Sequence, residues 1–307
     1  MNQLLKEIDE IPEMAREFLK SSSDFALPLD VPYIGMGSSY FAPLAFKYMG
    51  IDIHPEIASE YYNYVFDKEK HDFAVILSQS GESSESLWCR ELFGNYIAIT
   101  NNSNSSLAAH PNAKRTVLLH AGEEKYSSTK TYINTLLALF KGFGFNSAKA
   151  VELLNEKIQH YKQLGEKLAD DIFRKVTEER IHGIYLTGSG PNIATAYEAS
   201  LILSENTKLC FTGLPLAQYD HGPKETSAGS IVIQILAQGK SRDRSLILGE
   251  KISRAGAYVI TVEETDIDEN FSIIHNMVPF NYLAVYLAEK LGVTETFAVG
   301  GKITTVS

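Results

Sequence analysis

The sequence predicts an α/β fold with two consecutive units, each a parallel sheet flanked by helices, followed by a C-terminal tail. Strand-sized apolar runs alternate with helical patterns along the chain, and this alternation is typical of parallel sheets. The pattern also occurs twice, because the Gly/Ser turn at 35–39 has a counterpart at 188–190. With 307 residues, the chain is long enough for about two domains.

The first half is predicted to alternate strands with helices. Leu4, Leu5, Ile8 and Ile11 stand at helical spacing, and Pro12 interrupts the helix that they predict. The elements expected after it are a strand with a Gly/Ser turn at 33–39, a helix at 40–49, a strand at 73–77, a polar turn at 78–86, a helix at 87–93, a strand at 96–100 and a long, mostly buried helix at 130–145.

The second half repeats this order after a charged connecting helix at 148–180. Residues 184–190, 231–238 and 258–261 match the first Gly/Ser turn, the strand and turn at 75–79 and the strand at 96–100. Because spacings within the two copies differ, either an old duplication or the general order of α/β chains explains the match, and we favour duplication. The expected segments are N-terminal helices at 1–26, a first domain at 27–147, the connecting helix at 148–180, a second domain at 181–290 and a tail at 291–307.

The composition indicates an ordinary globular protein of the cytoplasm. Lysine and arginine total 28 against 38 aspartates and glutamates, a net charge of −10 with no basic block, so we do not expect a nucleic-acid partner. Cys89 and Cys210 have no CxxC neighbour, and the N-terminus does not resemble a secretion signal. No run approaches the roughly 18 apolar residues that span a bilayer, so no membrane partner is expected.

The two Gly/Ser turns do not predict a dinucleotide site. Each begins like the G-x-G-x-x-G pattern, but Tyr40 and Ile193 stand where its third glycine is required. A Walker A motif is absent from the sequence as well. A nicotinamide cofactor is therefore not expected.

The serine-rich turn at 78–86 is predicted to bind a phosphate group. It has five serines in nine positions between a strand and a helix, where hydroxyls and backbone N–H groups supply neutral donors. The alternative is a plain polar turn whose serine caps the helix. Because the carboxyl ends of parallel strands lie at one edge of a sheet, Ser38 and Ser39 should face the same crevice as Ser78 and Ser83, which favours the phosphate site.

Two residues of the second half are candidates for proton transfer. Glu205 shares a helix face with Glu198 among aliphatic residues. Burial there would favour the neutral carboxyl and suit a general base, whereas on a solvated face Glu205 would be an ordinary surface residue. His221 stands in an exposed turn and is either a proton carrier or a plain surface histidine.

The C-terminal tail carries a third candidate. Lys302 follows two glycines, and the apolar Ile303 and Val306 suggest that the tail docks on the protein. A docked tail could present the lysine amine to a carbonyl or a phosphate, whereas most chain termini are loose.

Taken in order, these motifs resemble those of the sugar isomerase (SIS) domain family. They are most similar to the isomerase half of glucosamine-6-phosphate synthase, the glutamine–fructose-6-phosphate aminotransferase, and to its stand-alone deaminase relatives. The resemblance covers nearly the whole chain and is carried by residues 5–12, 37–40, 58–61, 78–83, 99–101, 128–130, 198, 205, 221–223 and 302–306.

The resemblance implies two tandem SIS-type units of flavodoxin-like or Rossmann-like form and a ketose/aldose-type reaction on a hexose 6-phosphate, without a metal or organic cofactor. Glu205 would be the base that moves a proton between C1 and C2. His221 would help to open the sugar ring from the neighbouring subunit of a homodimer with a shared active site, and Lys302 would lie at the sugar end. The implied substrate- and phosphate-binding residues are Ser38, Ser39, Ser78, Gln79, Ser80, Ser83 and Ser128.

Two departures from the family pattern refine the expected activity. Ile202 stands where the synthase has a lysine three residues before its catalytic glutamate, which puts a synthase-like use of that amine in doubt. The chain opens directly on the isomerase-type segment with no cysteine near its N-terminus, so glutamine hydrolysis is not expected.

The sequence therefore predicts deamination of glucosamine 6-phosphate to fructose 6-phosphate and ammonia, or the reverse with free ammonia or ammonia from a separate amidotransferase subunit. The alternatives are deglycation of a fructosamine 6-phosphate, phosphohexose isomerisation without an amine, and a non-catalytic sugar-phosphate sensor.

Overall fold

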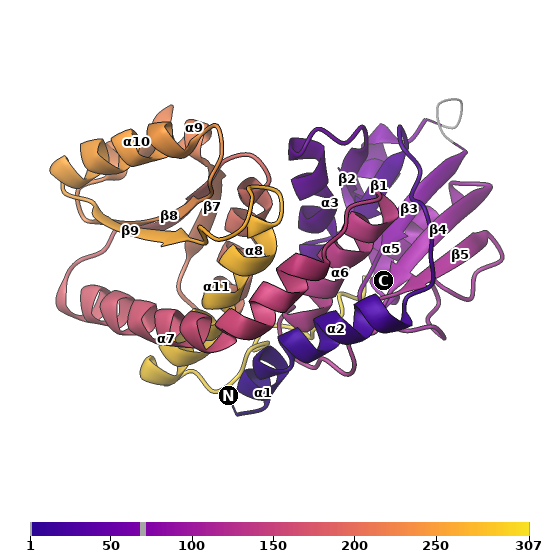
Figure 1. The fold of residues 1–307 in the computed structure, drawn as a ribbon, viewed down its shortest axis with the longest axis horizontal. Helices are drawn as coiled ribbons and strands as arrows, with labels where there is room; N and C mark the ends of the chain where they lie inside the picture. Colours follow the sequence, from indigo (N-terminus) through magenta and orange to yellow (C-terminus); the bar gives the residue numbers. More distant parts are fainter. Residues whose placement is uncertain (1, 68–71, 307) are drawn as a thin grey trace. The chain divides into compact units, whose positions relative to one another are not determined.

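Two compact units make up the chain in the computed structural model, which describes residues 2–67 and 72–306 (Figure 1). We name each unit after its parallel sheet. The sheet A unit comprises Glu10–Val151 and the tail from Ala298 onward, and the sheet B unit comprises Glu152–Phe297 and the first helix. The segments expected at 1–26 and 291–307 are thus both divided between the two units.

Sheet A has five parallel strands in the order β2-β1-β3-β4-β5. The strands are β1 (Pro32–Gly35), β2 (His54–Ile57), β3 (Phe73–Leu77), β4 (Asn95–Thr100) and β5 (Ala113–Leu118). β1 pairs with β2 on one side and with β3 on the other, where Tyr33 lies opposite Val75. β1 and β3 are buried along nearly all of their length, as their apolar runs predict.

Helices cover both faces of sheet A. Successive strand residues point to opposite sides of the sheet, and apolar side chains on both sides have to be buried. Ile34 and Ile76 pack on one face in the core that includes Tyr61. Tyr33 packs on the other face against an aromatic group around Phe46. The helical elements of this unit are α2 (Ile11–Ser21), α3 (Ser38–Tyr48), α4 (Ala58–Glu60), the π-helical turn Tyr61–Val65, α5 (Ser84–Trp88), the 3₁₀ turn Cys89–Glu91 and α6 (Lys130–Gly142).

Sheet B has four parallel strands in the order β7-β6-β8-β9, which corresponds to the first four strands of sheet A. The strands are β6 (Gly183–Gly188), β7 (Phe211–Pro215), β8 (Ser230–Leu236) and β9 (Tyr258–Glu263). The helical elements are α1 (Asn2–Asp9), α7 (Ala148–Glu178), α8 (Asn192–Thr207), α9 (Leu216–Asp220), the 3₁₀ turn Pro223–Thr226, α10 (Arg242–Arg254) and α11 (Ser272–Lys290). The common strand order supports the duplication that the sequence suggests, which stays a proposal.

The first helix belongs to the sheet B unit because its last residue is held there. The Asp9 carboxylate accepts hydrogen bonds from the Tyr282 hydroxyl at 2.8 Å and from the Lys162 ammonium at 3.1 Å. Leu4 and Ile8 of the same helix are buried. α2 begins at Ile11 and packs with α6 in the other unit, so the chain changes units at the break that the proline predicts.

The predicted α/β class, with parallel sheets flanked by helices, is confirmed. The sequence analysis missed β2, β5 and β7, which lie at sheet edges. Edge strands have an exposed side, so their sequences mix polar with apolar residues and lack the apolar runs of central strands. Within the described ranges, no helix combines the length and the hydropathy that crossing a lipid bilayer requires.

Gly35 and Gly188 occupy matching positions at the ends of the first strands of the two sheets. A Cβ atom on Gly35 would lie 2.5 Å from the carbonyl oxygen of Ser39, and one on Gly188 would lie 2.1 Å from that of Asn192. Both distances are far shorter than a nonbonded contact. The two glycines therefore let the following helix begin directly against the end of the strand.

We expect Gly35→Ala to destabilise the protein by about 2 kcal/mol, because the added methyl group meets backbone that cannot move away alone. Gly222→Ala is the matched control, since no atom lies within 4 Å of a Cβ placed there. Urea unfolding followed by circular dichroism measures both variants. Equal stability of the two variants would show that the turn after β1 has room for a side chain.

Candidate functional site

The carboxyl ends of the sheet A strands bring the predicted serine residues to one edge. The chain leaves β1 toward β2 and leaves β3 toward β4, which lie on opposite sides of the β1–β3 pair. Loops that leave two adjacent strands in opposite directions open a crevice, the usual ligand site of parallel sheets. Ser38 and Ser39 begin α3 directly after the turn that follows β1, and Ser78–Ser83 follow β3.

The turn after β3 is held in shape by its own hydroxyl groups. The Ser78 oxygen accepts the N–H of Gly81 at 3.1 Å, and the Ser80 oxygen accepts the N–H of Glu82 at 3.1 Å. Gly81 has a φ of +68°, and a Cβ on it would lie 2.2 Å from the Ser105 hydroxyl. Each serine oxygen that accepts a bond can still donate its own proton, so the turn keeps donor capacity for a ligand.

A pocket of about 400 Å³ lies at this edge of sheet A. Its lining residues are mostly polar and come from the turns after β3 and β4, the loop before α6 and the tail. They include the glutamates Glu82, Glu123 and Glu124 as well as Gln79, Ser80, Asn101, Asn102 and Ile303. Two residues predicted for the substrate site, Gln79 and Ser80, therefore line it. The other predicted residues, Ser38, Ser39, Ser78, Ser83 and Ser128, are not among its lining residues.

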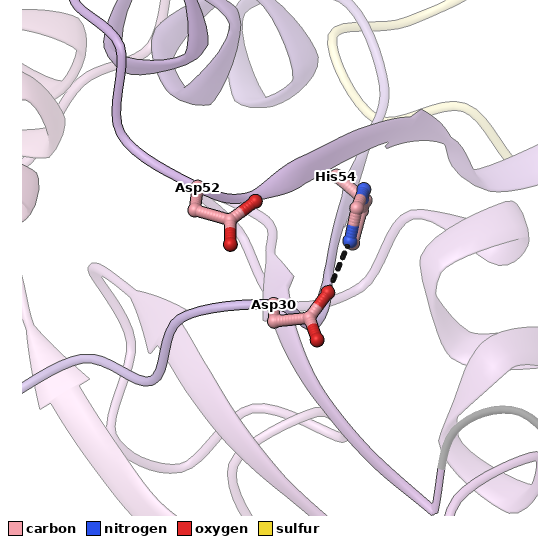
Figure 2. Close-up of side chains that lie close together, drawn as sticks. All are labelled: Asp30, Asp52 and His54. Carbon is pink, nitrogen blue, oxygen red and sulfur yellow. Dashed lines mark hydrogen bonds and ion pairs between the residues drawn. The ribbon is translucent and has the colours of Figure 1, made fainter.

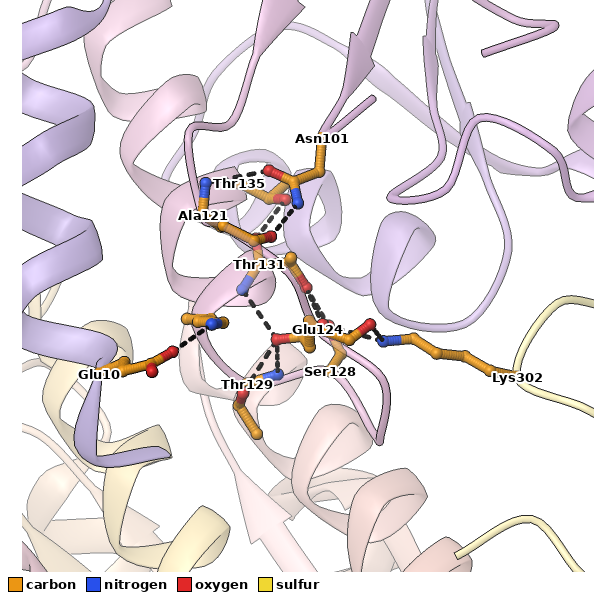
Figure 3. Close-up of polar contacts among 11 residues, drawn as sticks. Glu10, Asn101, Ala121, Glu124, Ser128, Thr129, Thr131, Thr135 and Lys302 are labelled. Carbon is orange, nitrogen blue, oxygen red and sulfur yellow. Dashed lines mark hydrogen bonds and ion pairs between the residues drawn. The ribbon is translucent and has the colours of Figure 1, made fainter. Parts of the chain in front are cut away.

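The loop before α6 places a buried carboxylate beside the pocket (Figure 3). The side chain of Glu124 is fully buried and accepts hydrogen bonds from the N–H groups of Thr129 and Thr131 and from both threonine hydroxyls. Ser128, in the same loop, lies 3.1 Å from the Thr131 hydroxyl. The sequence analysis missed Glu124, because an acidic residue in a polar loop carries no sign of burial.

Lys302 reaches this carboxylate from the tail. Its ammonium group donates to the Glu124 backbone carbonyl at 2.8 Å and to the Glu124 carboxylate at 3.3 Å. The tail is also held at Ser84, whose N–H donates to the Thr304 carbonyl at 3.1 Å and whose hydroxyl accepts the Val306 N–H at 2.9 Å. Ile303 and Val306 stay 42% and 49% exposed, so polar bonds hold the tail rather than the apolar side chains on which the docking prediction was based.

The other candidate residues lie in the sheet B unit. Glu205 is half-buried near the end of α8, and Glu198 on the same helix is completely buried, as is Ile202 between them. Lys208, with a φ of +63°, donates to the backbone carbonyls of Glu205 and Thr296. His221 follows the last residue of α9 and is exposed.

The carboxyl edge of sheet B is occupied by a buried polar network. Glu264, directly after β9, accepts hydrogen bonds of 2.6 Å from both Lys157 and the Tyr161 hydroxyl, and that hydroxyl lies 2.9 Å from Nδ1 of His275. Burial alone would raise the pKa of Glu264, but the bonds from Lys157, Tyr161 and the Asp266 N–H outweigh it and lower this pKa to about 2. Burial lowers the pKa of His275 to about 4.

A second carboxylate, Glu269, lies against the turns that follow β6 and β8. A Cβ placed on Gly239 would lie 2.1 Å from the Glu269 carboxyl carbon, and one on Gly190 would lie 3.3 Å from a carboxylate oxygen. In sheet A the corresponding turns carry serine residues. Glutamates also line the pocket of sheet A, so carboxylates occur at the carboxyl edges of both sheets.

One group of side chains could hold a metal ion by geometry. Asp30, Asp52 and His54 each offer a ligand atom within 4.8 Å of the others, and His54 Nε2 lies 2.8 Å from Asp30 (Figure 2). The group stands at the amino ends of β1 and β2, the edge of sheet A opposite the pocket. Exposed acidic groups of this kind are common without a metal ion, so this geometry alone assigns no site.

Comparison with known proteins gives distant relatives among the isomerizing aminotransferases. The glutamine–fructose-6-phosphate aminotransferase (isomerizing) of Sulfolobus acidocaldarius is 26% identical over 312 residues, which cover 95% of this chain and 50% of the relative. That of Thermococcus kodakarensis is 27% identical over 330 residues, covering 93% of this chain and 54% of the relative. The chain is a homologue of these aminotransferases. It spans about half of their length, and no family model matches its sequence.

Solved structures with the same fold align with nearly the whole of this chain. Glucosamine-6-phosphate deaminase of Thermotoga maritima aligns with a TM-score of 0.79 at 19% identity, covering 98% of this chain and 99% of that one. The C-terminal domain of the aminotransferase of Francisella tularensis aligns with a TM-score of 0.76 at 21% identity, covering 95% of this chain and 97% of that one. These findings confirm the sugar isomerase resemblance recognised in the sequence.

We expect the free energy of unfolding of this protein to fall as the pH decreases from 6.5 to 4. The unfolded chain binds a proton on His275 near pH 6.5, whereas the folded chain does so only near pH 4. The loss attributable to this residue is up to about 3 kcal/mol. His275→Asn should remove this part of the pH dependence, leaving the loss that Glu264 causes below about pH 4.5.

Melting temperatures of the original chain and the variant between pH 7 and pH 4 test this expectation. His160→Asn is the control, because it replaces an exposed histidine of α7 by the same residue. Parallel curves for the original chain and His275→Asn would contradict the assignment.

Proposed function

We propose that this protein is a phosphosugar isomerase of the deaminating kind, which converts glucosamine 6-phosphate and water to fructose 6-phosphate and ammonia. One arrangement carries the proposal: a polar pocket at the carboxyl edge of sheet A, lined by the serine-bearing turn after β3 and by the tail residue next to Lys302. Homology to isomerizing aminotransferases of fructose 6-phosphate supports the choice of substrate.

The phosphate group would bind at the turns after β1 and β3. Ser78, Gln79, Ser80 and Ser83 offer hydroxyl and amide donors after β3, Ser38 and Ser39 offer theirs at the start of α3, and Ser128 would contact the sugar. Neutral donors suit a dianion because each hydrogen bond to a charged group is stronger than one between neutral groups. The carboxylates of Glu82 and Glu123 in the pocket lining can accept bonds from sugar hydroxyls or from an amino group.

Proton transfer between C1 and C2 would be carried out by Glu205. A single base on one face of the substrate removes the proton from one carbon and returns it to the next, through an enol or enolamine. The half-buried position of Glu205 next to Ile202, whose side chain is buried, suits a base that is partly shielded from water. Ile202 stands where the synthase has a lysine, which argues against a synthase-like use of that amine.

His221 would assist opening of the sugar ring, and Lys302 would act at the sugar end. The exposure of His221 is compatible with a role in the active site of a neighbouring subunit, so the functional unit would be a homodimer with shared sites. In the reverse direction, ammonia would be free or come from a separate amidotransferase subunit. The proposed steps need no metal or organic cofactor.

Ammonia release from glucosamine 6-phosphate by the purified chain is the experiment that tests this proposal. We expect fructose 6-phosphate and ammonia in equal amounts. Glu205→Gln should lower kcat by roughly 10²–10⁴-fold, because the variant cannot take up the proton, while binding of fructose 6-phosphate is retained. The exposed Glu250→Gln on α10 serves as control.

Three outcomes would replace the proposal. Isomerisation of fructose 6-phosphate without an amine would indicate a phosphohexose isomerase, turnover of a fructosamine 6-phosphate alone would indicate a deglycase, and binding without turnover would indicate a sensor. Mixing Glu205→Gln with His221→Ala chains tests the shared site, because a hybrid dimer should regain activity that neither variant has. No recovery would place both residues in one subunit's site.

Replacing a serine of the β3 turn should weaken binding of phosphorylated sugars selectively. We expect Ser83→Ala to lose roughly tenfold in affinity for fructose 6-phosphate and nothing for fructose, because one hydrogen bond to a charged group is removed. Ser78→Ala should lose at least as much. Titration calorimetry measures each variant against Ser253→Ala, an exposed serine of α10. Equal losses for both sugars would refute the phosphate assignment.

A further inference from the structure

The loop that carries Glu124 is fixed to the end of β4 (Figure 3). The Asn101 side chain accepts the N–H of Ala121 at 3.0 Å and donates to the Gly122 carbonyl at 2.7 Å. The N–H of Leu119 donates to the Thr100 carbonyl at 3.0 Å. With its entry held by these bonds, the loop gives Glu124 a defined backbone position.

The two oxygens of the Glu124 carboxylate have different partners. Oε1 accepts the N–H groups of Thr129 and Thr131 at 3.0 and 3.2 Å and the Thr129 hydroxyl at 2.9 Å. It thereby caps α6, whose N-cap residue Thr129 makes no side-chain cap bond of its own. Oε2 accepts the Thr131 hydroxyl at 2.5 Å and faces the Lys302 ammonium at 3.3 Å.

Lys302 is held at this point by two acceptors of one residue, the Glu124 carboxylate and its backbone carbonyl. The lysine side chain is 21% exposed, whereas that of Glu124 is completely buried. The next tail residue, Ile303, lines the pocket, as does Glu124 itself. The amine therefore lies at the edge of the pocket, with its position set by a carboxylate that cannot move.

We propose that Glu124 is a positioning residue, which holds the Lys302 amine and with it the tail at the edge of the pocket. The N–H groups at the start of α6 bond only to Oε1, whereas Oε2 accepts the Thr131 hydroxyl and the Lys302 ammonium. The catalytic meaning of this contact rests on the proposed function of Lys302, but the contact itself can be tested without turnover.

Glu124→Gln separates the two roles of the side chain. The amide oxygen of glutamine can accept the N–H groups at the start of α6, whereas its NH₂ group cannot accept a bond from an ammonium. The matched control is Glu10→Gln, which removes the partly exposed carboxylate that pairs with the buried Lys130 ammonium at the start of α6.

Reductive methylation with formaldehyde and cyanoborohydride, followed by mass spectrometry, measures the reactivity of each lysine. Lys125, an exposed lysine of the same loop, is the internal reference. We expect Glu124→Gln to raise the rate at Lys302 relative to Lys125 roughly three- to tenfold. Glu10→Gln should leave the rate at Lys302 unchanged. An unchanged Lys302 rate in folded Glu124→Gln would overturn the proposal.

A second variant decides the question if Glu124→Gln does not fold. Lys302→Met changes only the tail, and we expect several-fold faster hydrogen exchange at the Val306 amide, which is bonded to Ser84. Unchanged exchange at this amide would show that the lysine does not hold the tail and would overturn the proposal.

A double-mutant cycle tests the effect on catalysis. Glu124→Gln should lower kcat at least tenfold in the original chain and leave it unchanged in the Lys302→Met background, because the glutamate acts through the lysine. Additive losses would overturn the positioning role in favour of helix capping alone. If the original chain releases no ammonia, the proposed function fails, and the lysine reactivity still decides whether Glu124 holds the tail.

Discussion

The parallel pairing of β1 with β3 is the constraint on which the rest of the candidate site depends. It brings two turns that are about 40 residues apart in the chain to one edge of sheet A and sends the chain away from them in opposite directions. Gly35 keeps the first of these turns short, because the absence of a side chain lets α3 begin directly against the end of β1. The hydroxyl-rich edge of sheet A follows from strand order and one glycine.

A buried carboxylate connects the two chain segments of the sheet A unit. Desolvation makes a buried charge costly, and the Glu124 side chain offsets this cost with bonds from two amides, two hydroxyls and an ammonium. The ammonium belongs to Lys302, which is 178 residues further along the chain. The chain passes through the sheet B unit and then returns. Its tail therefore completes the sheet A unit.

The two sheets have the same strand order but differ chemically at their carboxyl edges. Serine hydroxyls follow the central strands of sheet A, whereas Glu264 and Glu269 lie at the corresponding edge of sheet B. Glu264 is held by a lysine and a tyrosine, which keep it ionised over the ordinary pH range. Equal topology thus leaves the chemistry of each edge to its side chains, because a fold sets positions while side chains set charge.

The sequence by itself determined the α/β class, the central strands, the two glycine turns and the serine-rich turn after β3. These features are local, since buried runs and turn residues are read over a few neighbouring positions. It did not reveal the edge strands β2, β5 and β7, whose exposed sides weaken the apolar pattern. Only the tertiary structure decided that Glu124 is buried, that Lys302 reaches it and that polar bonds hold the tail. Burial and long-range pairing depend on residues far away in the chain, and no local pattern records them.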